Sequence, residues 1–303
     1  MAELVLDGGH RRQRLFRRSP VLLPTAIAAA TLVTWIVTVD RMQGMDAGPG
    51  TNLGGLGWFV GVWATMMAAM MLPSAMPTTL VFARVGAENQ RRSRSFLRTW
   101  VFISGYLAAW TAYGLLAYGV FRVIQSAHIH ALSWHARGPL IAGLAIVGAG
   151  LYQLSPLKGR CLRHCRSPRH YVLSGWRRGW SGAVRMGFEH GAFCIGCCWG
   201  LMLILFALGV MSITWMLVVA ATIFAEKVLP YGERLSTMFA VAFVLVGIWV
   251  AAAPSSVPGL TQPGSARATQ AMRAMGMHDK KTGMGMQKTH AMGTDKSGSM
   301  KMK

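Results

Sequence analysis

The sequence predicts an all-α, polytopic bundle of about seven transmembrane helices, with its N-terminus inside the cell and its C-terminus outside. Three observations support this fold class. Hydrophobic residues make up 53% of the 303-residue chain, more than a typical soluble domain carries. Several apolar runs approach or exceed 18 residues, enough to cross a hydrocarbon core about 30 Å thick. The Lys and Arg residues gather in a few segments between these runs, a pattern that orients helices in a membrane.

Seven apolar runs supply the expected spans. The first follows a basic N-terminal segment (1–20) and resembles a signal peptide. It is longer than a usual signal sequence, however, and no small-residue cleavage site follows it, so we expect it to remain as a span. The expected spans cover residues 21–39, 58–82, 99–123, 139–155, 184–210, 212–229 and 235–253. Together they form a transmembrane domain over residues 21–253.

The charge pattern predicts the location as well as the topology. The basic segments are the N-terminus and the loops after the second and fourth spans, so these should be cytoplasmic. This orientation places the protein in the inner (cytoplasmic) membrane as a multi-pass protein, with its C-terminal tail in the periplasm or outside the cell. The net charge of +21 lies largely in these loops, so it indicates a lipid bilayer as partner and no nucleic acid. A homo-oligomer is compatible with the sequence.

The fifth span contains the sequence EHGAFCIGCCWG over residues 189–200. On a helix, His190, Cys194, Cys197 and Cys198 share one face, and Glu189 lies at its edge. Ionisable residues within spans usually face the bundle interior and serve a function. Thiolates and imidazoles bind Cu(I), Zn(II) and iron. The alternative is that cysteine packs here as a small hydrophobic residue.

The second span contains the methionine-rich sequence WATMMAAMMLPSAMP. Two pairs four residues apart, Met66/Met70 and Met67/Met71, place thioethers on neighbouring positions of the helix. Thioether is a neutral, soft ligand that favours Cu(I), although methionine also fills gaps in a core. The topology predicts that these residues lie at a membrane depth similar to that of the cysteines.

The end of the sixth span and the inner loop after the fourth span add candidates with competing interpretations. Glu226, near the end of the sixth span, would complete an ion path with Glu189, whereas Lys227 is expected to snorkel or to form a boundary ion pair. The inner loop carries Cys161, His164 and Cys165, which would either pass metal to a cytosolic carrier or form an ordinary reduced loop. The five cysteines give no even disulfide framework.

The last fifty residues, 254–303, have the composition of a disordered tail. Methionine and histidine recur there, which suggests a copper-collecting arm in an oxidising compartment. The candidate ligands of this arm are Met275, Met277, His278, Met284 and Met286. The alternative is a low-complexity tail with incidental methionines. An outer loop with His128, His130 and His135 is open to the same two interpretations.

The methionine sequence of the second span, HGAFCIGCCWGLM of the fifth and the Glu226-Lys227 pair of the sixth together resemble a bacterial family of predicted metal-binding integral membrane proteins, a domain of unknown function. The resemblance covers roughly residues 55–250. It implies metal binding and establishes neither the metal nor a reaction. The positions it singles out are Met66, Met67, Met70, Met71, Pro73, His190, Cys194, Cys197, Cys198, Glu226 and Lys227.

The sequence therefore predicts a membrane protein that binds a soft metal, Cu(I) first with zinc or iron not excluded, for transport, delivery or homeostasis. One alternative is a thiol–disulfide relay through Cys194 and Cys197. Another is a factor that inserts metal into a partner membrane enzyme, so the expected partners include a metallochaperone or a metalloenzyme. No catalytic residue set is identified, and a non-enzymatic role is favoured. The sequence also lacks the G-x-x-x-x-G-K-[ST] motif of nucleotide-driven pumps.

Overall fold

The computed structural model describes residues 2–43, 54–89, 92–126, 137–209, 212–258, 260–262 and 265–274. All regular structure within these ranges is helical, which confirms the all-α fold class. The helices are α1 (Ala2–Met42), α2 (Leu56–Asn89), α3 (Arg92–Ser126), α4 (Gly138–Tyr152), α5 (Pro156–Arg166), α6 (Pro168–Ser174), α7 (Gly179–Leu208), α8 (Ile213–Val228), α9 (Gly232–Ala252), the 3-10 helix η2 (Pro254–Ser256) and α10 (Ala266–Ala274).

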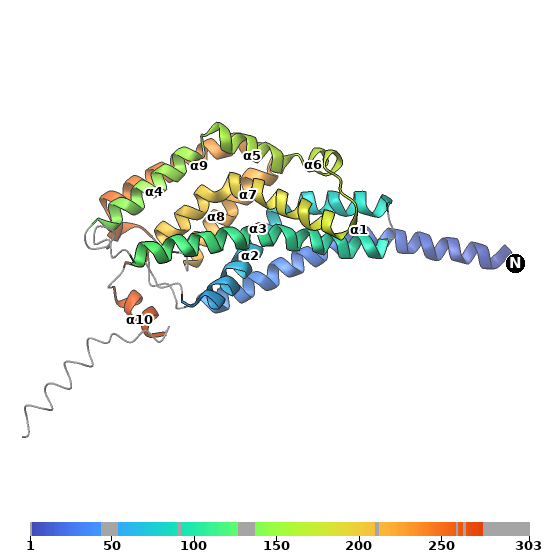
Figure 1. The fold of residues 1–303 in the computed structure, drawn as a ribbon, viewed down its shortest axis with the longest axis horizontal. Coiled ribbons are helices and arrows are strands. Elements are labelled where there is room, and N and C mark those ends of the chain that lie inside the picture. The colour runs from blue at the N-terminus through green and yellow to red at the C-terminus, as the bar shows by residue number, and fades with distance from the viewer. Residues whose placement is uncertain are drawn as a thin grey trace, which may run out of the picture.

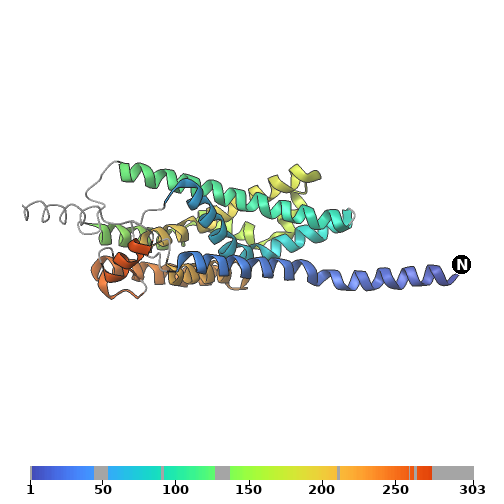
Figure 2. The ribbon, with the colours of Figure 1, turned by 90° about the horizontal axis from the view of Figure 1, so that it is seen from below.

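The long helices run roughly along one axis and form an elongated bundle (Figure 1, Figure 2). α3 packs along α7, α4 along α9, and α1 along α2. α7 also contacts α4, α5 and α8, so it holds the central position. The N-terminal part of α1 projects beyond the bundle at one end (Figure 1). Residues on α7 are therefore the ones that several other helices can surround.

Five described helical segments are long and apolar enough to cross a membrane: Leu22–Met42, Leu56–Ala87, Ser95–Ile124, Gly179–Leu208 and Gly232–Ala252. α4 and α5 meet at 62° and make a sixth if the bent pair is one span. α8 has 16 residues, so at 1.5 Å per residue it is about 24 Å long, shorter than a hydrocarbon core of about 30 Å. The chain is thus a multi-pass membrane protein, while the count of seven spans and their orientation stay predictions.

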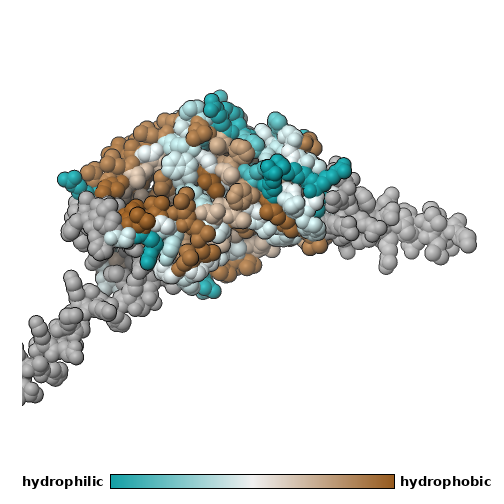
Figure 3. Space-filling view, in the orientation of Figure 1, coloured by the Kyte–Doolittle hydropathy of each residue, from teal (hydrophilic) through white to brown (hydrophobic). Residues whose placement is uncertain are grey.

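The outer surface has the character that lipid contact requires. Apolar side chains cover much of the visible face of the bundle (Figure 3). Leucines on four different helices are 60% to 67% exposed, namely Leu32, Leu116, Leu144 and Leu245. Soluble monomers rarely expose apolar surface to this extent. These helices therefore bury polar groups inside the bundle and present hydrocarbon outward.

Two regions predicted as irregular contain helices. α5 and α6 occupy much of residues 158–185, the basic loop predicted after the fourth span, and η2 and α10 lie within the predicted tail 254–303. α5 begins with Pro156 after an N-cap serine, Ser155, whose side chain accepts a hydrogen bond from the Lys158 backbone N–H at 3.2 Å. Because the N-cap serine and the proline favour the start of a helix, this segment is helical despite its basic, loop-like composition.

Small residues let α3 and α7 approach closely, as is common between membrane helices. A Cβ atom on Gly105 would lie 2.3 Å from the Val184 carbonyl oxygen, and one on Gly187 would lie 2.0 Å from that of Phe102. Both distances are far below van der Waals contact, and backbone atoms cannot swing aside. Glycine is therefore required at these two positions to seat α7 against α3.

Replacing Gly105 with Ala should lower the free energy of unfolding by about 1–3 kcal/mol, because the added methyl group pushes α7 off α3. Gly119→Ala is the matched control on the same helix, since a Cβ there meets nothing within 4 Å. Denaturant unfolding of the purified protein in detergent compares the two. Equal stability of both variants would contradict the close packing described for Gly105.

Candidate metal centre

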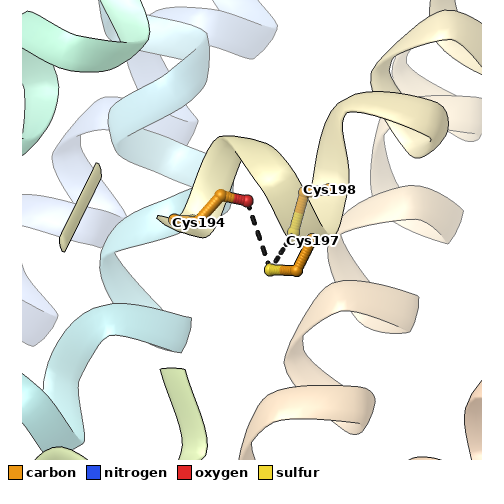
Figure 4. A group of neighbouring side chains, drawn as sticks. All are labelled: Cys194, Cys197 and Cys198. Carbon is orange, nitrogen blue, oxygen red and sulfur yellow. Dashed lines mark hydrogen bonds between the residues drawn. The ribbon is translucent and has the colours of Figure 1, made fainter. Parts of the chain in front are cut away.

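Three cysteine thiols meet in the core of the bundle on α7. Cys194, Cys197 and Cys198 are spaced i, i+3, i+4, so one helix face carries them all. Their sulfur atoms lie within 4.8 Å of one another, and each residue is at most 1% exposed. The Cys197 sulfur lies 3.3 Å from that of Cys198 and donates to the Cys194 carbonyl oxygen at 3.2 Å (Figure 4). We call these three residues the thiol trio.

Two polar side chains from other helices reach the first sulfur of the trio. Tyr106 of α3 places its hydroxyl 3.0 Å from Cys194 Sγ, and Lys227 of α8 donates from Nζ to the same sulfur at 2.8 Å. Lys227 is only 9% exposed, so the expectation that it snorkels or forms a boundary ion pair is wrong. A cation this close in a low-dielectric interior stabilises negative charge on the sulfur. The trio is therefore built to carry anionic sulfur.

α5 brings the remaining two cysteines against the trio. Cys165 is buried, and its sulfur lies 4.0 Å from Cys197 Sγ. Cys161, one turn earlier and partly exposed, lies over Gly196, where a Cβ would come within 2.8 Å of its sulfur. All five cysteines are free thiols. The sequence left open whether this inner segment is an ordinary loop, and the structure shows that it is a helix packed against the cysteine-bearing face of α7.

A buried ion pair fixes α5 in this position. Lys158, near the start of α5, donates to both carboxylate oxygens of Glu226 on α8, at 2.8 and 2.7 Å, and to Ser236 on α9 at 3.0 Å. It also donates to the side chain of Gln153 at the α4–α5 bend. At the other end of α5, Arg166 donates to the backbone oxygen of Glu226 at 2.5 Å. These contacts tie α5 to α8 and α9 beside the trio.

His190, one turn before the first thiol, is 3% exposed and lies outside the trio. Its ring lies 5.3 to 6.1 Å from the rings of Phe102, Tyr106 and Tyr171. Burial raises the pKa of Tyr171, whose hydroxyl donates to the Met186 carbonyl oxygen. The His190 Nδ1 atom has no hydrogen-bond partner among the described residues. A buried imidazole nitrogen of this kind is available to a metal.

The methionines of α2 share one core with the trio. Trp63, one turn before them, stacks on Phe206 of α7 with 5.8 Å between ring centroids and donates to the Trp110 carbonyl oxygen at 2.9 Å. The four methionines are at most 1% exposed and belong to the same cluster of buried residues as the cysteines: Met66, Met67, Met70 and Met71. The match in membrane depth, and a metal-binding role for them, stay predictions.

The two predicted acidic ligands have other partners. Glu189 is about one-third exposed and pairs with Arg185 at 2.9 Å and with Arg177 at 3.3 Å. Glu226 is buried, and Lys158 occupies both of its oxygens. The structure therefore does not bring either carboxylate to the trio. The ion path expected between them stays untested.

Several predicted ligands fall outside the described residues. These are His128, His130 and His135 of the outer loop, and Met275, Met277, His278, Met284 and Met286 of the tail. Their role as a collecting arm stays a prediction.

Several residues around the trio were not predicted to lie there, and the sequence contains only weak indications of their positions. Cys165 stood out as half of an i, i+4 pair, but nothing indicated that its helix folds back on α7. Tyr106 was not singled out, because a tyrosine in an apolar span is ordinary. Glu226 was the available signal for Lys158, because a carboxylate buried in a span needs a basic partner. Only the packing of α8 shows that Lys227 points to a thiol.

Chemically, the centre offers three soft ligands, a nearby cation and a fourth thiol in contact with one of the three. Thiolates favour Cu(I), zinc and iron–sulfur chemistry over hard cations such as Mg²⁺. Because the trio is buried, a bound ion would be shielded from water and from oxidants. The arrangement is suited to holding a soft metal.

Comparison with known proteins also indicates a role with copper. A family model described as "PpoB2: Copper chaperone" matches residues 60–250, well over half of the chain. The matched range contains the methionines of α2, all five cysteines, His190 and Lys227. No curated protein and no solved structure matches this chain.

Proposed function

Because this chain belongs to the PpoB2 copper-chaperone family, we propose that it binds Cu(I) inside the membrane and delivers it to a partner metalloprotein. The ligands in this proposal are the three sulfurs of the thiol trio. The observation that carries it is the meeting of three buried sulfurs within 4.8 Å beside a buried lysine. Copper is the cargo of such a protein, so its site must both hold and release the ion.

The donor set favours Cu(I) over the other soft metals. Structural zinc sites take four ligands in tetrahedral geometry, whereas the ligand atoms that lie within 4.8 Å of one another are three, since His190 lies outside the trio and Cys165 is in contact with Cys197 alone. Thiolates are preferred ligands of Cu(I), and the neutral thioethers of α2 suit the same ion. If the purified protein contains zinc or iron in place of copper, the preference for Cu(I) is wrong.

Lys227 has a specific place in this proposal. Several thiolates around one monovalent ion leave net negative charge, which is costly in an apolar interior. The Lys227 ammonium group, 2.8 Å from Cys194 Sγ, offsets part of that charge. It acts as a positioning and charge-balancing residue and not as a ligand, since an ammonium group has no lone pair.

Replacing Lys227 with Met should raise the dissociation constant for Cu(I) about 10- to 100-fold, the usual cost of losing a partner behind a metal ligand. Methionine has a similar volume, so packing is preserved. Val228→Met is the matched control, because Val228 is the next residue and is 40% exposed. Competition titration against a Cu(I) chelator measures the effect, and an unchanged dissociation constant would remove Lys227 from the account.

Transport across the membrane is the second candidate, and the methionines of α2 are the observation that favours it. Thioethers in the same core as the thiols would let Cu(I) move between soft ligands at little desolvation cost. In this version the tail residues Met275, Met277, His278, Met284 and Met286 collect the ion. Uptake of Cu(I) into proteoliposomes that contain only this protein would favour transport, and its absence would favour delivery.

The burial of the trio argues against a thiol–disulfide relay. Exchange needs an accessible thiolate, and Cys194 and Cys197 are at most 1% exposed. Recovery of a mixed disulfide on either residue from cells would support the relay and count against copper delivery.

Metal analysis of the purified protein tests the proposal. After growth in copper-replete medium, the wild type should carry stoichiometric copper, and a Cys194→Ser, Cys197→Ser, Cys198→Ser triple variant should not. The Gly119→Ala variant, whose added Cβ meets nothing within 4 Å, serves as the purification control. Substoichiometric copper in the wild type that is unchanged in the triple variant would refute copper binding at this site.

A further inference from the structure

The trio is closed to water, so any ion bound there needs a route to the outside of the bundle. We propose that Cys165 and Cys161 on α5 form this route, as a thiol path through which Cu(I) exchanges between the trio and the surface. The inference rests on the proposed function, since it describes how cargo reaches and leaves the same site.

The first step of the path is the contact between Cys197 and Cys165. Metal–sulfur bonds are about 2.3 Å long in zinc–thiolate sites, so two sulfurs sharing one ion lie up to about 4.6 Å apart. The sulfur atoms of Cys197 and Cys165 are 4.0 Å apart. One ion can therefore bind to both at once without movement of either helix.

The second step leads outward along α5. Cys161 lies one turn before Cys165, on the same face of the helix. Exposure increases along the series: Cys197 is 1% exposed, Cys165 is 9% exposed, and Cys161 is partly exposed. Gly196 opens the space for Cys161, because any larger residue there would collide with its sulfur. The five free thiols thus lie in order of increasing exposure, from the trio in the core to Cys161 at the edge of the bundle.

The path is held at both ends. Lys158, one turn before Cys161, is bound to Glu226, and Arg166, next to Cys165, donates to the backbone oxygens of Glu226 and Pro230 at 2.5 and 2.9 Å. The segment with the two cysteines therefore has a fixed distance from α7. A fixed distance is what repeated ligand exchange requires.

Each exchange is balanced in charge and atoms. A copper–sulfur bond to the receiving cysteine forms as the bond to the previous cysteine breaks, and copper remains Cu(I) throughout. The proton lost by the receiving thiol passes to the thiolate that is left behind. No oxidant or reductant is consumed.

The test compares copper content and copper release in the purified protein in detergent under anaerobic conditions. Each variant is loaded with Cu(I), and release is followed by absorbance after addition of excess bathocuproine disulfonate, a bulky, charged Cu(I) chelator. Cys161→Ser and Cys165→Ser should keep the copper content of the wild type and release it at least about tenfold more slowly, because a positioned ligand has been lost. Gly159→Ser is the matched control on α5, since a Cβ there meets only the far end of Arg163, at 3.9 Å.

Release by both cysteine variants at the wild-type rate would overturn the path. Loss of bound copper from Cys165→Ser would also overturn it, because Cys165 would then be a ligand of the resting site. If Cys165→Ser does not fold, the partly exposed Cys161→Ser decides alone. Failure of the proposed function is distinct, because the wild type itself would then bind no Cu(I).

Discussion

Replacing Glu226 with Leu should lower the free energy of unfolding by about 3–5 kcal/mol, because it leaves the buried Lys158 ammonium group without its counter-charge. Lys158 is 1% exposed, and Glu226 accepts from it through both carboxylate oxygens. Because Lys158 is buried, bulk water does not reach its ammonium group to replace these contacts. The loss should appear as a lower midpoint in denaturant unfolding of the purified protein in detergent.

Two further variants separate this cause from simple loss of a side chain. A Lys158→Met, Glu226→Leu double variant removes both charges, so much of the lost stability should return. Glu233→Leu removes an exposed carboxylate, about two-thirds exposed and 3.8 Å from Arg163, and should change the stability by no more than about 1 kcal/mol. A double variant as unstable as Glu226→Leu alone would show that the charge pair is not the source of the effect.

The second large effect concerns Cys197, the central sulfur of the trio. Cys197→Ser should raise the dissociation constant for Cu(I) more than about 100-fold, because losing a partner behind a ligand already costs 10- to 100-fold. Cys197 is in contact with both Cys198, at 3.3 Å, and Cys165, at 4.0 Å, so its loss removes the sulfur that links the trio to α5. Competition titration with a Cu(I) chelator measures the change.

Cys161→Ser is the control for this experiment. Cys161 is a cysteine of the same bundle that lies outside the trio, so its loss should leave the dissociation constant near the wild-type value. Equal weakening by Cys161→Ser and Cys197→Ser would mean that affinity does not depend on the trio.

Local pattern was sufficient to predict the long apolar helices and the shared face of the thiols, but not the short helices α5, α6 and α10. Apolar runs bounded by charged residues mark helix positions, and the spacing of Cys194, Cys197 and Cys198 depends only on 3.6 residues per turn. The same geometry explains why Glu189 stands apart from His190. Adjacent residues point about 100° apart, and Arg185 lies four residues before Glu189 on its own side of the helix.

The partners of the trio depend on tertiary packing, which spacing along one helix does not determine. Lys227 ends a helix, where a lysine usually reaches the membrane surface, yet here it turns inward to a thiol. α5 is short and basic, so its composition is typical of a loop, and the contacts of Lys158 and Arg166 with Glu226 hold it on the bundle. Contacts between residues far apart in the chain determine both the inward direction of Lys227 and the packing of α5 on the bundle.

X-ray absorption at the copper edge is the most direct test of Cu(I) binding by the thiol trio. In purified, copper-loaded wild type, the edge should be that of Cu(I), and the first shell should contain sulfur. In the Cys194→Ser, Cys197→Ser, Cys198→Ser variant, this sulfur-bound copper should be absent. Cu(II) in a shell of nitrogen and oxygen, or an unchanged sulfur shell in the triple variant, would contradict the account.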